Sequence, residues 1–271
     1  MTGIAPLQFI RGRRVRDLSI AREPKPAWLK VRAPGSPNYL RLKEVMRGLK
    51  LHTVCEEAHC PNIGECWHHG TATFMIMGDV CTRACGYCNV THGAPAQLDA
   101  PEPENLARAV EALPLAYVVV TSVDRDDLPD FGGSAFASTI RAIKARRPDC
   151  RVEVLIPDFQ GQEQPLRTVL DARPDVLNHN IETVPRLYRT ARPGGRYARA
   201  LELIDRARQW APEIPRKTGL MVGLGEEWDE VVGVFRDLRS VDCQILTMGQ
   251  YPRPSLAHLP MSRYYTPDEI R

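Results

Sequence analysis

The chain has 271 residues, of which 43% are hydrophobic and 25% are charged, and its formal net charge is +3. These proportions are those of globular proteins, and they exclude a mostly disordered or a fibrous chain. No stretch reaches the roughly 18 unbroken apolar residues of a membrane span, so we expect a soluble protein of one large domain or two small ones.

The N-terminal segment is basic and rich in proline. Residues 1–50 contain twelve Lys or Arg and three Asp or Glu, whereas the remainder of the chain has a small acidic excess. Such an arm favours an acidic partner or nucleic acid, and the alternative is a solvated extension. We expect residues 22–37 to be extended and to wrap the rest of the protein. Because no secretory signal is visible and the acidic residues argue against a mitochondrial presequence, we expect a cytoplasmic location.

Six of the eight cysteines lie within 34 residues and form two groups of three. The first triplet is Cys55, Cys60 and Cys66, and the second triplet is Cys81, Cys85 and Cys88, with the spacing C-x3-C-x2-C. Clustered thiols in a reducing compartment indicate metal rather than disulfides. Structural zinc usually takes four ligands in pairs, whereas three thiolates on an iron–sulfur cluster leave one iron open for another ligand. We therefore favour iron–sulfur sites, with zinc as the alternative.

The rest of the chain alternates short apolar runs with amphipathic stretches. We expect strands at residues 72–77, 117–121, 152–156, 175–178, 217–222 and 244–248, and helices at residues 102–113, 133–146, 165–172, 198–210 and 228–238. This alternation predicts an α/β fold with a parallel sheet. Only about 180 residues lie between Thr71 and Tyr251, too few for an eight-unit barrel of roughly 250 residues. We therefore predict a partial (β/α)6 barrel at residues 71–271, after an N-terminal segment at residues 1–70 that carries the basic arm and the first triplet.

Polar residues follow several of the predicted strands. Ser122 and Asp124 follow the second strand, and Asn178, Asn180 and Glu182 lie at the end of the fourth. In parallel barrels the functional groups lie at the carboxyl ends of the strands. The second triplet follows the first strand, so we expect these residues to meet it at one rim.

The second triplet reads Cys81-Thr-Arg-Ala-Cys85-Gly-Tyr-Cys88, with an aromatic residue before its last cysteine. This pattern resembles the radical S-adenosylmethionine (SAM) enzymes. In that superfamily three thiolates hold a four-iron four-sulfur cluster, whose open iron binds SAM, and one electron cleaves SAM to a 5′-deoxyadenosyl radical. The resemblance implies that Cys81, Cys85 and Cys88 hold such a cluster. It also makes Ser122, Asn180, Glu182 and Arg192 candidate SAM contacts, although the polar strand end could simply cap a turn and Arg192 could be a surface residue.

The first triplet and several later blocks together resemble the lipoyl synthase family. The matching blocks are residues 53–67 (TVCEEAHCPNIGECW), 70–90, 121–128 (TSVDRDDL), 176–193, 217–226 and 249–264. The resemblance implies that Cys55, Cys60 and Cys66 hold an auxiliary four-iron four-sulfur cluster that is consumed as the sulfur source. The implied reaction inserts sulfur at carbons 6 and 8 of an octanoyl chain bound to a lysine, with one SAM spent per C–H bond.

The resemblance also implies the partners. These are octanoylated lipoyl carrier domains or the glycine cleavage H protein, and an electron donor such as ferredoxin or flavodoxin, with neither nucleic acid nor membrane among them. We expect the basic arm to recognise the acidic surface of a carrier domain. Two rivals stay open: a radical SAM enzyme that methylthiolates RNA, and a non-catalytic iron–sulfur electron carrier or cluster scaffold.

The C-terminal part departs from the family pattern. In the family a serine of an Arg-Ser-Ser-Tyr motif near the end is the fourth ligand of the auxiliary cluster, and no such motif occurs in this chain, which stops at Arg271. Ser255 and Ser262 lie in other blocks, and we assign the role to neither. A truncated chain, an incomplete gene and a natural variant are the explanations, and each leaves complete turnover open.

Overall fold

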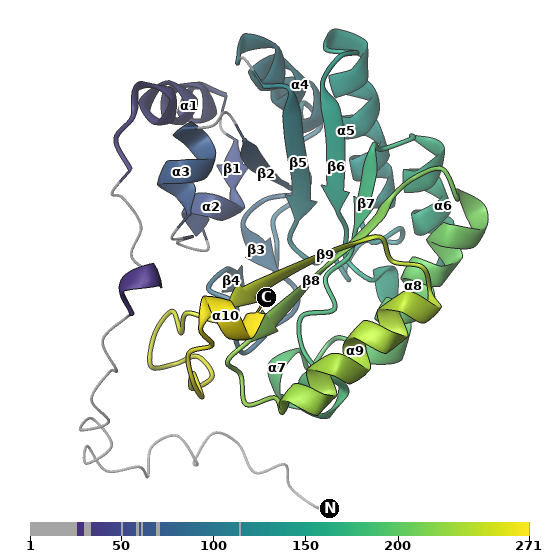
Figure 1. Ribbon diagram of the computed structural model, residues 1–271. Coiled ribbons are helices and arrows are strands. Elements are labelled where there is room, and N and C mark those ends of the chain that lie inside the picture. Colours follow the sequence, from purple (N-terminus) through teal and green to yellow (C-terminus); the bar gives the residue numbers. More distant parts are fainter. Residues whose placement is uncertain are drawn as a thin grey trace, which may run out of the picture. The chain divides into compact units, whose positions relative to one another are not determined.

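The computed structural model describes residues 26–29, 34–49, 51–57, 60, 62–68, 71–113 and 115–270 (Figure 1). The chain forms two compact units, Met1–Arg32 and Ala33–Arg271. In the first unit the described residues contain a single 3-10 turn at Ala27–Leu29. Most of the predicted basic arm lies outside the described residues. The predicted division at residue 70 separates two functional segments rather than two compact units, and it stays a prediction.

The second unit is built on a seven-stranded sheet with the order β1-β2-β5-β6-β7-β8-β9. Its strands are β1 (His52–Thr53), β2 (Ala72–Ile76), β5 (Tyr117–Ser122), β6 (Arg151–Leu155), β7 (Val176–Asn178), β8 (Arg216–Val222) and β9 (Ile245–Gln250). The last six are parallel neighbours in chain order. They are the six predicted strands, each within two residues at either end. The partial (β/α)6 architecture is therefore confirmed.

The five predicted helices lie between the strands and cover the outer face of the sheet (Figure 1). They are α4 (Glu102–Ala112), α5 (Gly133–Arg146), α6 (Glu163–Asp171), α8 (Tyr197–Trp210) and α9 (Trp228–Ser240). Right-handed crossovers between parallel strands place such helices on one face. Among the described helices, none combines the length and the apolar character that a bilayer span requires.

The core lies between the sheet and these helices. Strand residues such as Phe74, Val118 and Val152 pack against Leu106 and Phe136, and all five are fully buried. Each contributes about 1.5–3 kcal/mol through burial of apolar surface. Because these strands are covered on both faces, they read in the sequence as almost unbroken apolar runs, and this made them predictable.

The segment before β2 contains elements that the sequence analysis did not predict. These are α1 (Pro37–Gly48), the antiparallel strand β1, α2 (Val54–Glu57) and α3 (Ile63–His68). Helix α1 starts at Ser36, whose side chain accepts the Tyr39 N–H, and a proline occupies its first turn. It packs on α3 through Tyr39 and Trp67, whose ring centroids are 4.9 Å apart. This segment carries the first triplet beside the edge of the sheet.

Three further short elements complete the unit. A two-stranded parallel ladder joins β3 (Val80–Cys81) to β4 (Thr91–His92), and it brackets the second triplet. The connection after β7 contains the 3-10 turn η4 (Pro185–Leu187) and α7 (Tyr188–Ala191), and a 3-10 turn η3 (Phe159–Gly161) follows β6. The last described helix is α10 (Pro267–Ile270).

Candidate functional site

The loop of the second triplet begins with a sharp turn at the carboxyl end of β2. Met77 and Gly78 have φ angles of 68° and 87°, so the backbone adopts left-handed conformations at two successive residues. Such a conformation is uncommon for a residue other than glycine, and it often occurs at functional sites. Two contacts hold Met77 there, because its N–H donates to Glu102 at 2.8 Å and its carbonyl accepts from Arg125 at 3.2 Å. The turn directs the chain across the open end of the sheet.

The three thiols of the second triplet line one cavity of about 210 Å³. The Cys81 Sγ accepts N–H groups from Arg83 at 3.4 Å and Asp124 at 3.3 Å. Burial, followed by the nearby charge of Asp124, raises the pKa of Cys81 to about 11, and burial raises the pKa of Cys85 to about 12. With raised pKa values these thiols are protonated in the cluster-free chain at neutral pH, and binding of a metal would release their protons.

The spacing of the thiols bears on the zinc alternative. Within the described residues, the set of three His, Cys, Asp or Glu with ligand atoms all within 4.8 Å is His52, Glu57 and Asp79, and neither cysteine triplet meets that limit. Four sulfurs around one zinc at ~2.3 Å would lie about 3.8 Å apart. As the thiols lie in the described residues, neither triplet is gathered around one point, so the arrangement does not support the zinc alternative.

The structure brings the four predicted SAM contacts to the cavity of the second triplet. Its lining includes Ser122 at the end of β5, Asn180 and Glu182 after β7, and Arg192 after α7. The Ser122 hydroxyl is buried and has no hydrogen-bond partner among the described residues. A buried hydroxyl without a partner is costly unless a ligand or water satisfies it. The cavity thus contains a polar group available to a bound molecule.

Glu182 is held in a strained position beside the cavity. Its φ is 65°, its N–H donates to the Gly219 carbonyl at 2.9 Å, and its carboxylate accepts from the Asn180 amide at 3.3 Å. Burial raises the pKa of Glu182, and the positive charge of Arg192 acts in the opposite direction. A Cβ on Gly219 would lie 2.6 Å from Asn180 Oδ1, so glycine is needed for this approach. Asn180 and Glu182 together present an amide and a carboxylate group to the cavity.

Arg192 is buried, with 7% of its surface exposed, so the surface alternative for this residue is wrong. Its Nη1 donates to the Asn180 carbonyl at 2.7 Å. A Cβ on Gly195 would lie 2.7 Å from Arg192 Cδ, so the loop packs closely on the arginine stem. The guanidinium can pair with a carboxylate in the cavity.

Asn178 does not line the cavity, in contrast to what its place at the strand end suggests. Its amide donates to Glu153 Oε1 at 3.0 Å, and Glu153 also accepts from Lys217 at 2.9 Å. Asn178 bonds to Glu153 rather than lining the cavity because it is still part of β7, as its last residue. Asn180 lies beyond the end of that strand. Asp124 does line the cavity, as the rim argument predicts.

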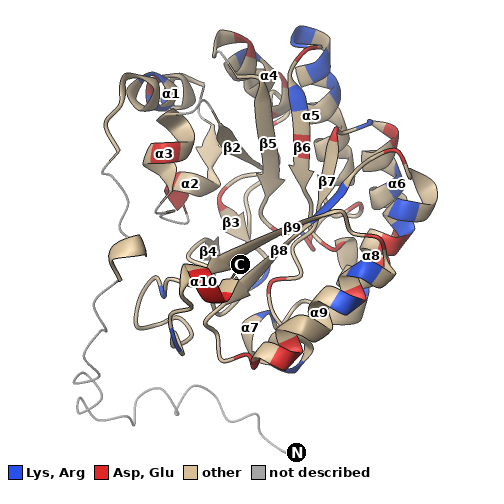
Figure 2. Ribbon diagram, viewed as in Figure 1, with Lys and Arg blue, Asp and Glu red and all other residues tan. Residues whose placement is uncertain are grey.

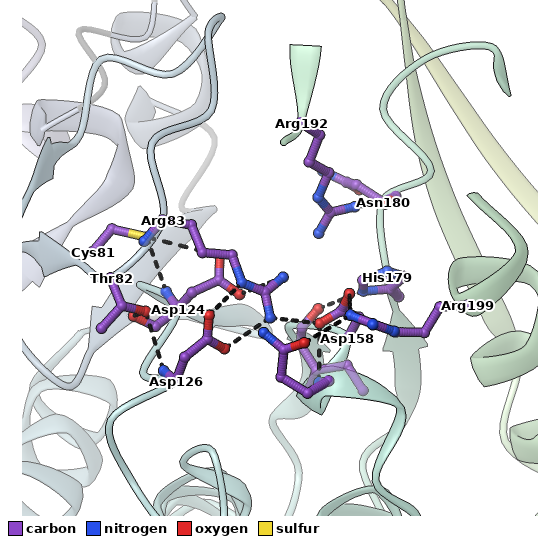
Figure 3. A network of polar contacts seen from close by, with 12 residues as sticks. Cys81, Thr82, Arg83, Asp124, Asp126, Asp158, His179, Asn180, Arg192 and Arg199 are labelled. Atoms are coloured by element: carbon purple, nitrogen blue, oxygen red, sulfur yellow. Dashed lines mark hydrogen bonds and ion pairs between the residues drawn. The ribbon is translucent and has the colours of Figure 1, made fainter. Parts of the chain in front are cut away.

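Arg83, within the second triplet's loop, was missed by the sequence analysis. Its side chain is 3% exposed and forms ion pairs with Asp124, Asp126 and Asp158 (Figure 3). In the sequence an arginine between two cysteines of a loop indicates an exposed polar residue, and only the fold shows that it is buried.

In the first triplet Cys55 lies on α2 and Cys66 on α3, and Cys60 lies in the connection between them. Cys55 is 7% exposed, and burial, followed by the effect of Cys60, raises its pKa to about 11. The Cys60 N–H donates to the Cys55 carbonyl at 3.0 Å, and the Cys66 carbonyl accepts from Thr71 at 2.9 Å. Burial also raises the pKa of Cys66, which suits the same proton-releasing metal chemistry.

Helix α2, which carries Cys55, lies beside the cavity of the second triplet. Val54, the residue before Cys55, lines the cavity that the second triplet lines. The Asn89 amide, directly after Cys88, donates to the Glu57 carbonyl at 3.4 Å. Helix α2 of the first triplet therefore borders the cavity of the second.

Comparison with known proteins agrees with this geometry. The profile of the Radical SAM superfamily matches residues 75–238, and that of the N-terminal domain of lipoyl synthase of the Radical_SAM family matches residues 10–60. A lipoyl synthase from Thioalkalivibrio sulfidiphilus is 59% identical over 247 residues, which are 91% of this chain and 77% of that protein. One from Rubrobacter xylanophilus is 55% identical over 265 residues, which are 98% of this chain and 81% of that protein.

A solved structure is similar in fold. The crystal structure of HydG, a maturase of the [FeFe]-hydrogenase, has a TM-score of 0.57 at 16% identity, and the match covers 87% of this chain and 53% of that one. At this identity the likeness extends to the fold alone. The sequence comparisons carry the assignment further, because two lipoyl synthases are more than half identical to nearly the whole chain. The chain therefore belongs to the lipoyl synthase family of the radical SAM superfamily.

Proposed function

We propose that this protein inserts two sulfur atoms, at carbons 6 and 8, into an octanoyl chain that is amide-linked to a lysine of a lipoyl carrier domain. The observation that carries the proposal is one cavity that is lined by Cys81, Cys85 and Cys88 and by polar side chains, and that is bordered by helix α2 of the first triplet. Family membership supports the lipoyl product.

The second triplet would hold the cluster that binds SAM. When bound, this cluster supplies the electron that cleaves SAM, and the resulting 5′-deoxyadenosyl radical removes a hydrogen atom that acid–base groups of a protein do not remove. The chain's own residues bind and orient. Arg192 would pair with the carboxylate of SAM, and Glu182 and Asn180 would accept hydrogen bonds from its ammonium or ribose hydroxyls. The half-enclosed cavity limits access of water to the reacting atoms.

The first triplet would hold the second cluster, and we propose that this cluster is the sulfur donor. The support is positional, because α2 carries Cys55 and its neighbour Val54 faces the cavity. A carbon radical formed in the cavity needs a sulfur atom within direct reach. The proposed partners are an octanoylated carrier domain and an electron donor of the ferredoxin or flavodoxin class. The basic arm remains the candidate contact with an acidic carrier surface.

An anaerobic assay tests the proposed function. The chain, reconstituted with iron and sulfide, is mixed with SAM, a chemical reductant and an octanoyl-lysine peptide, and both 5′-deoxyadenosine and the peptide mass are followed. We expect 5′-deoxyadenosine release that the peptide accelerates, together with a peptide that has gained two sulfurs as a dithiol and that loses two hydrogens when it is afterwards oxidised to the disulfide. An electron carrier would release no 5′-deoxyadenosine, and a methylthiolating enzyme would leave the peptide unchanged. Either result contradicts the proposal.

A further inference from the structure

The roles proposed above do not explain why Arg83 is buried in the loop of the second triplet. It lies midway between two proposed ligands, Cys81 and Cys85, yet its side chain is 3% exposed and turned away from solvent. A buried guanidinium is costly unless its charge is paired and its N–H groups are bonded. The ligand loop thus carries a charge that the fold must accommodate.

Three aspartates from two different strand ends surround this charge (Figure 3). Arg83 Nε and Nη2 donate to the two oxygens of Asp126 at 2.7 and 2.8 Å, and Nη2 also donates to Asp158 Oδ1 at 2.7 Å. Its Nη1 lies 3.4 Å from Asp124 Oδ1. Asp124 and Asp126 follow β5, and Asp158 follows β6. The forked guanidinium therefore ties the ligand loop to two strand ends, a geometry that lysine does not reproduce.

Asp158 anchors the far side of this cluster. It is 2% exposed, accepts from Arg199 of α8 at 3.0 Å, and accepts the Gln160 N–H that begins η3. Burial alone would raise the pKa of Asp158, but the hydrogen bond and charge of Arg83 outweigh that effect, and the pKa falls to about 2. The carboxylate is therefore ionised at neutral pH and bonds the ligand loop to a helix on the outer face.

The stem of Arg83 is confined by a separate part of the chain. A Cβ on Gly194 would lie 2.7 Å from Arg83 Cδ, and the neighbouring Gly195 packs in the same way on Arg192. One pair of glycines after α7 thus presses on the arginine of the ligand loop and on a proposed SAM contact. This packing constraint on Arg83 is independent of the ion pairs, because it depends only on the space around the methylene groups of the side chain.

We infer that Arg83 is a positioning residue, which fixes the loop of Cys81, Cys85 and Cys88 on the strand ends before any cluster is bound. The inference rests on the proposed ligand role of these cysteines. Ordering a loop costs conformational entropy, so a loop that is already ordered binds its cofactor without that cost. The Arg83 N–H donates to Cys81 Sγ at 3.4 Å, so the ion pairs also hold the backbone next to the first ligand.

Hydrogen exchange of the cluster-free chain tests this inference directly. The amides of residues 81–88 are compared between the natural chain and the variant Arg83→Gln. We expect exchange in this loop to become faster by about tenfold or more, since removal of one partner leaves buried charges unpaired. Arg83→Lys should recover only part of the protection. Gly194→Ala should give the same loop-specific change while every charged group is retained, so the result does not depend on one variant folding.

The matched control is Arg146→Gln. Arg146 also pairs with two carboxylates, Glu104 and Glu111, but its side chain is 33% exposed, and it belongs to α5, on which Figure 2 shows basic residues in blue. We expect no change in the loop. Equal exchange in Arg83→Gln and the natural chain would overturn the inference, and so would faster exchange in all elements alike, which is the result of general destabilisation.

A spectroscopic readout follows in the reconstituted chain. The electron paramagnetic resonance signal of the reduced second-triplet cluster is recorded with and without SAM. We expect Arg83→Gln to broaden this signal and to weaken its response to SAM, and an unaltered signal would contradict the inference. If the natural chain assembles no cluster, the proposed function fails, whereas the exchange data on the cluster-free chain still decide the role of Arg83.

Discussion

The two cysteine triplets are held by different forces. The loop of the second triplet is fixed by buried ion pairs around Arg83 and by a strained turn at Met77. In the first triplet Cys55 and Cys66 lie on two short helices, and the second of these, α3, is anchored by apolar packing of Trp67 on Tyr39. Directional ion pairs specify one arrangement, whereas apolar packing tolerates repacking. The difference matches the proposed roles, in which the second triplet holds a cofactor that survives each turnover and the first holds a sulfur source that is dismantled and rebuilt.

Cysteine replacement has the largest expected effect on this comparison. Cys85→Ala should abolish 5′-deoxyadenosine release, whereas Cys55→Ala should retain it and abolish sulfur insertion. Each variant should lower the iron content from about eight to about four per chain, because we propose that each triplet holds one four-iron cluster. Iron analysis and chromatography of the two products check both expectations. If Cys55→Ala also loses SAM cleavage, the division of labour between the triplets is wrong.

Mild acid should lower the free energy of unfolding of the cluster-free chain, because a buried histidine must then be protonated on unfolding. His179 follows β7 and is buried; burial, followed by the charge of Arg192, lowers its pKa to about 4. The unfolded chain binds this proton below about pH 6.5 and the folded chain only below about pH 4, so stability falls as pH drops through that window, by about 3 kcal/mol in total.

Urea unfolding of the cluster-free chain at pH 7 and pH 5 measures this dependence, and His179→Gln should remove its share of it. The matched control is His258→Gln. His258 bonds Ser255 and the Cys88 carbonyl in a partly buried setting. If the free energy of unfolding depends on pH equally in the natural chain and in His179→Gln, the pKa of His179 is not lowered by folding and the prediction is wrong.

Glu182→Gln should weaken SAM binding without loss of iron. A hydrogen bond to a charged group is worth about 1.5–3 kcal/mol, so we expect the Kd for SAM to rise by about tenfold to a hundredfold. Equilibrium binding to the reconstituted chain measures this. Glu202→Gln, on the exposed face of α8, should bind SAM as the natural chain does. A normal Kd for Glu182→Gln would remove Glu182 from the SAM site.

Gly219→Ala should have the smallest effect. Its Cβ would lie 2.6 Å from Asn180 Oδ1, a flexible side-chain atom that can move away, so we expect SAM binding to weaken by about threefold, or roughly 0.7 kcal/mol. The control is Gly233→Ala in α9, where nothing lies within 4 Å of the added Cβ. This control should slightly stabilise the helix and leave SAM binding unchanged. Unaltered binding in Gly219→Ala would show that the position of Asn180 is not critical.

The sequence predicts the barrel well because its signal is local. Strands that are buried on both faces appear as apolar runs, and the helices between them have regular apolar faces. The rim residues Ser122, Asn180 and Glu182 follow from the same logic, since the end of a parallel strand defines its functional edge. The two cysteine triplets were predicted from the spacing of the cysteines alone, without knowledge of the fold.

The parts that were missed depend on contacts between distant segments. Strand β1 has two residues, too few for a periodic pattern, and it exists because it pairs with β2. Helix α1 was hidden by the proline-rich composition before it, although Tyr39, Leu42 and Met46 have helical spacing. The ion pair of Arg83 with Asp158 joins residues 75 positions apart, and sequence spacing contains no trace of such a pair. Whether a charged side chain is buried depends on contacts in the folded chain, which residue spacing does not reveal.

The direct test of the account is the origin of the inserted sulfur. The chain is reconstituted with iron and isotopically heavy sulfide, freed of unbound sulfide, and allowed one turnover with SAM, reductant and octanoyl-lysine peptide. The account predicts that the product carries heavy sulfur and that the iron of the first triplet is released, while the signal of the second cluster persists. Product sulfur of natural isotopic composition, or loss of the second cluster in place of the first, would contradict it.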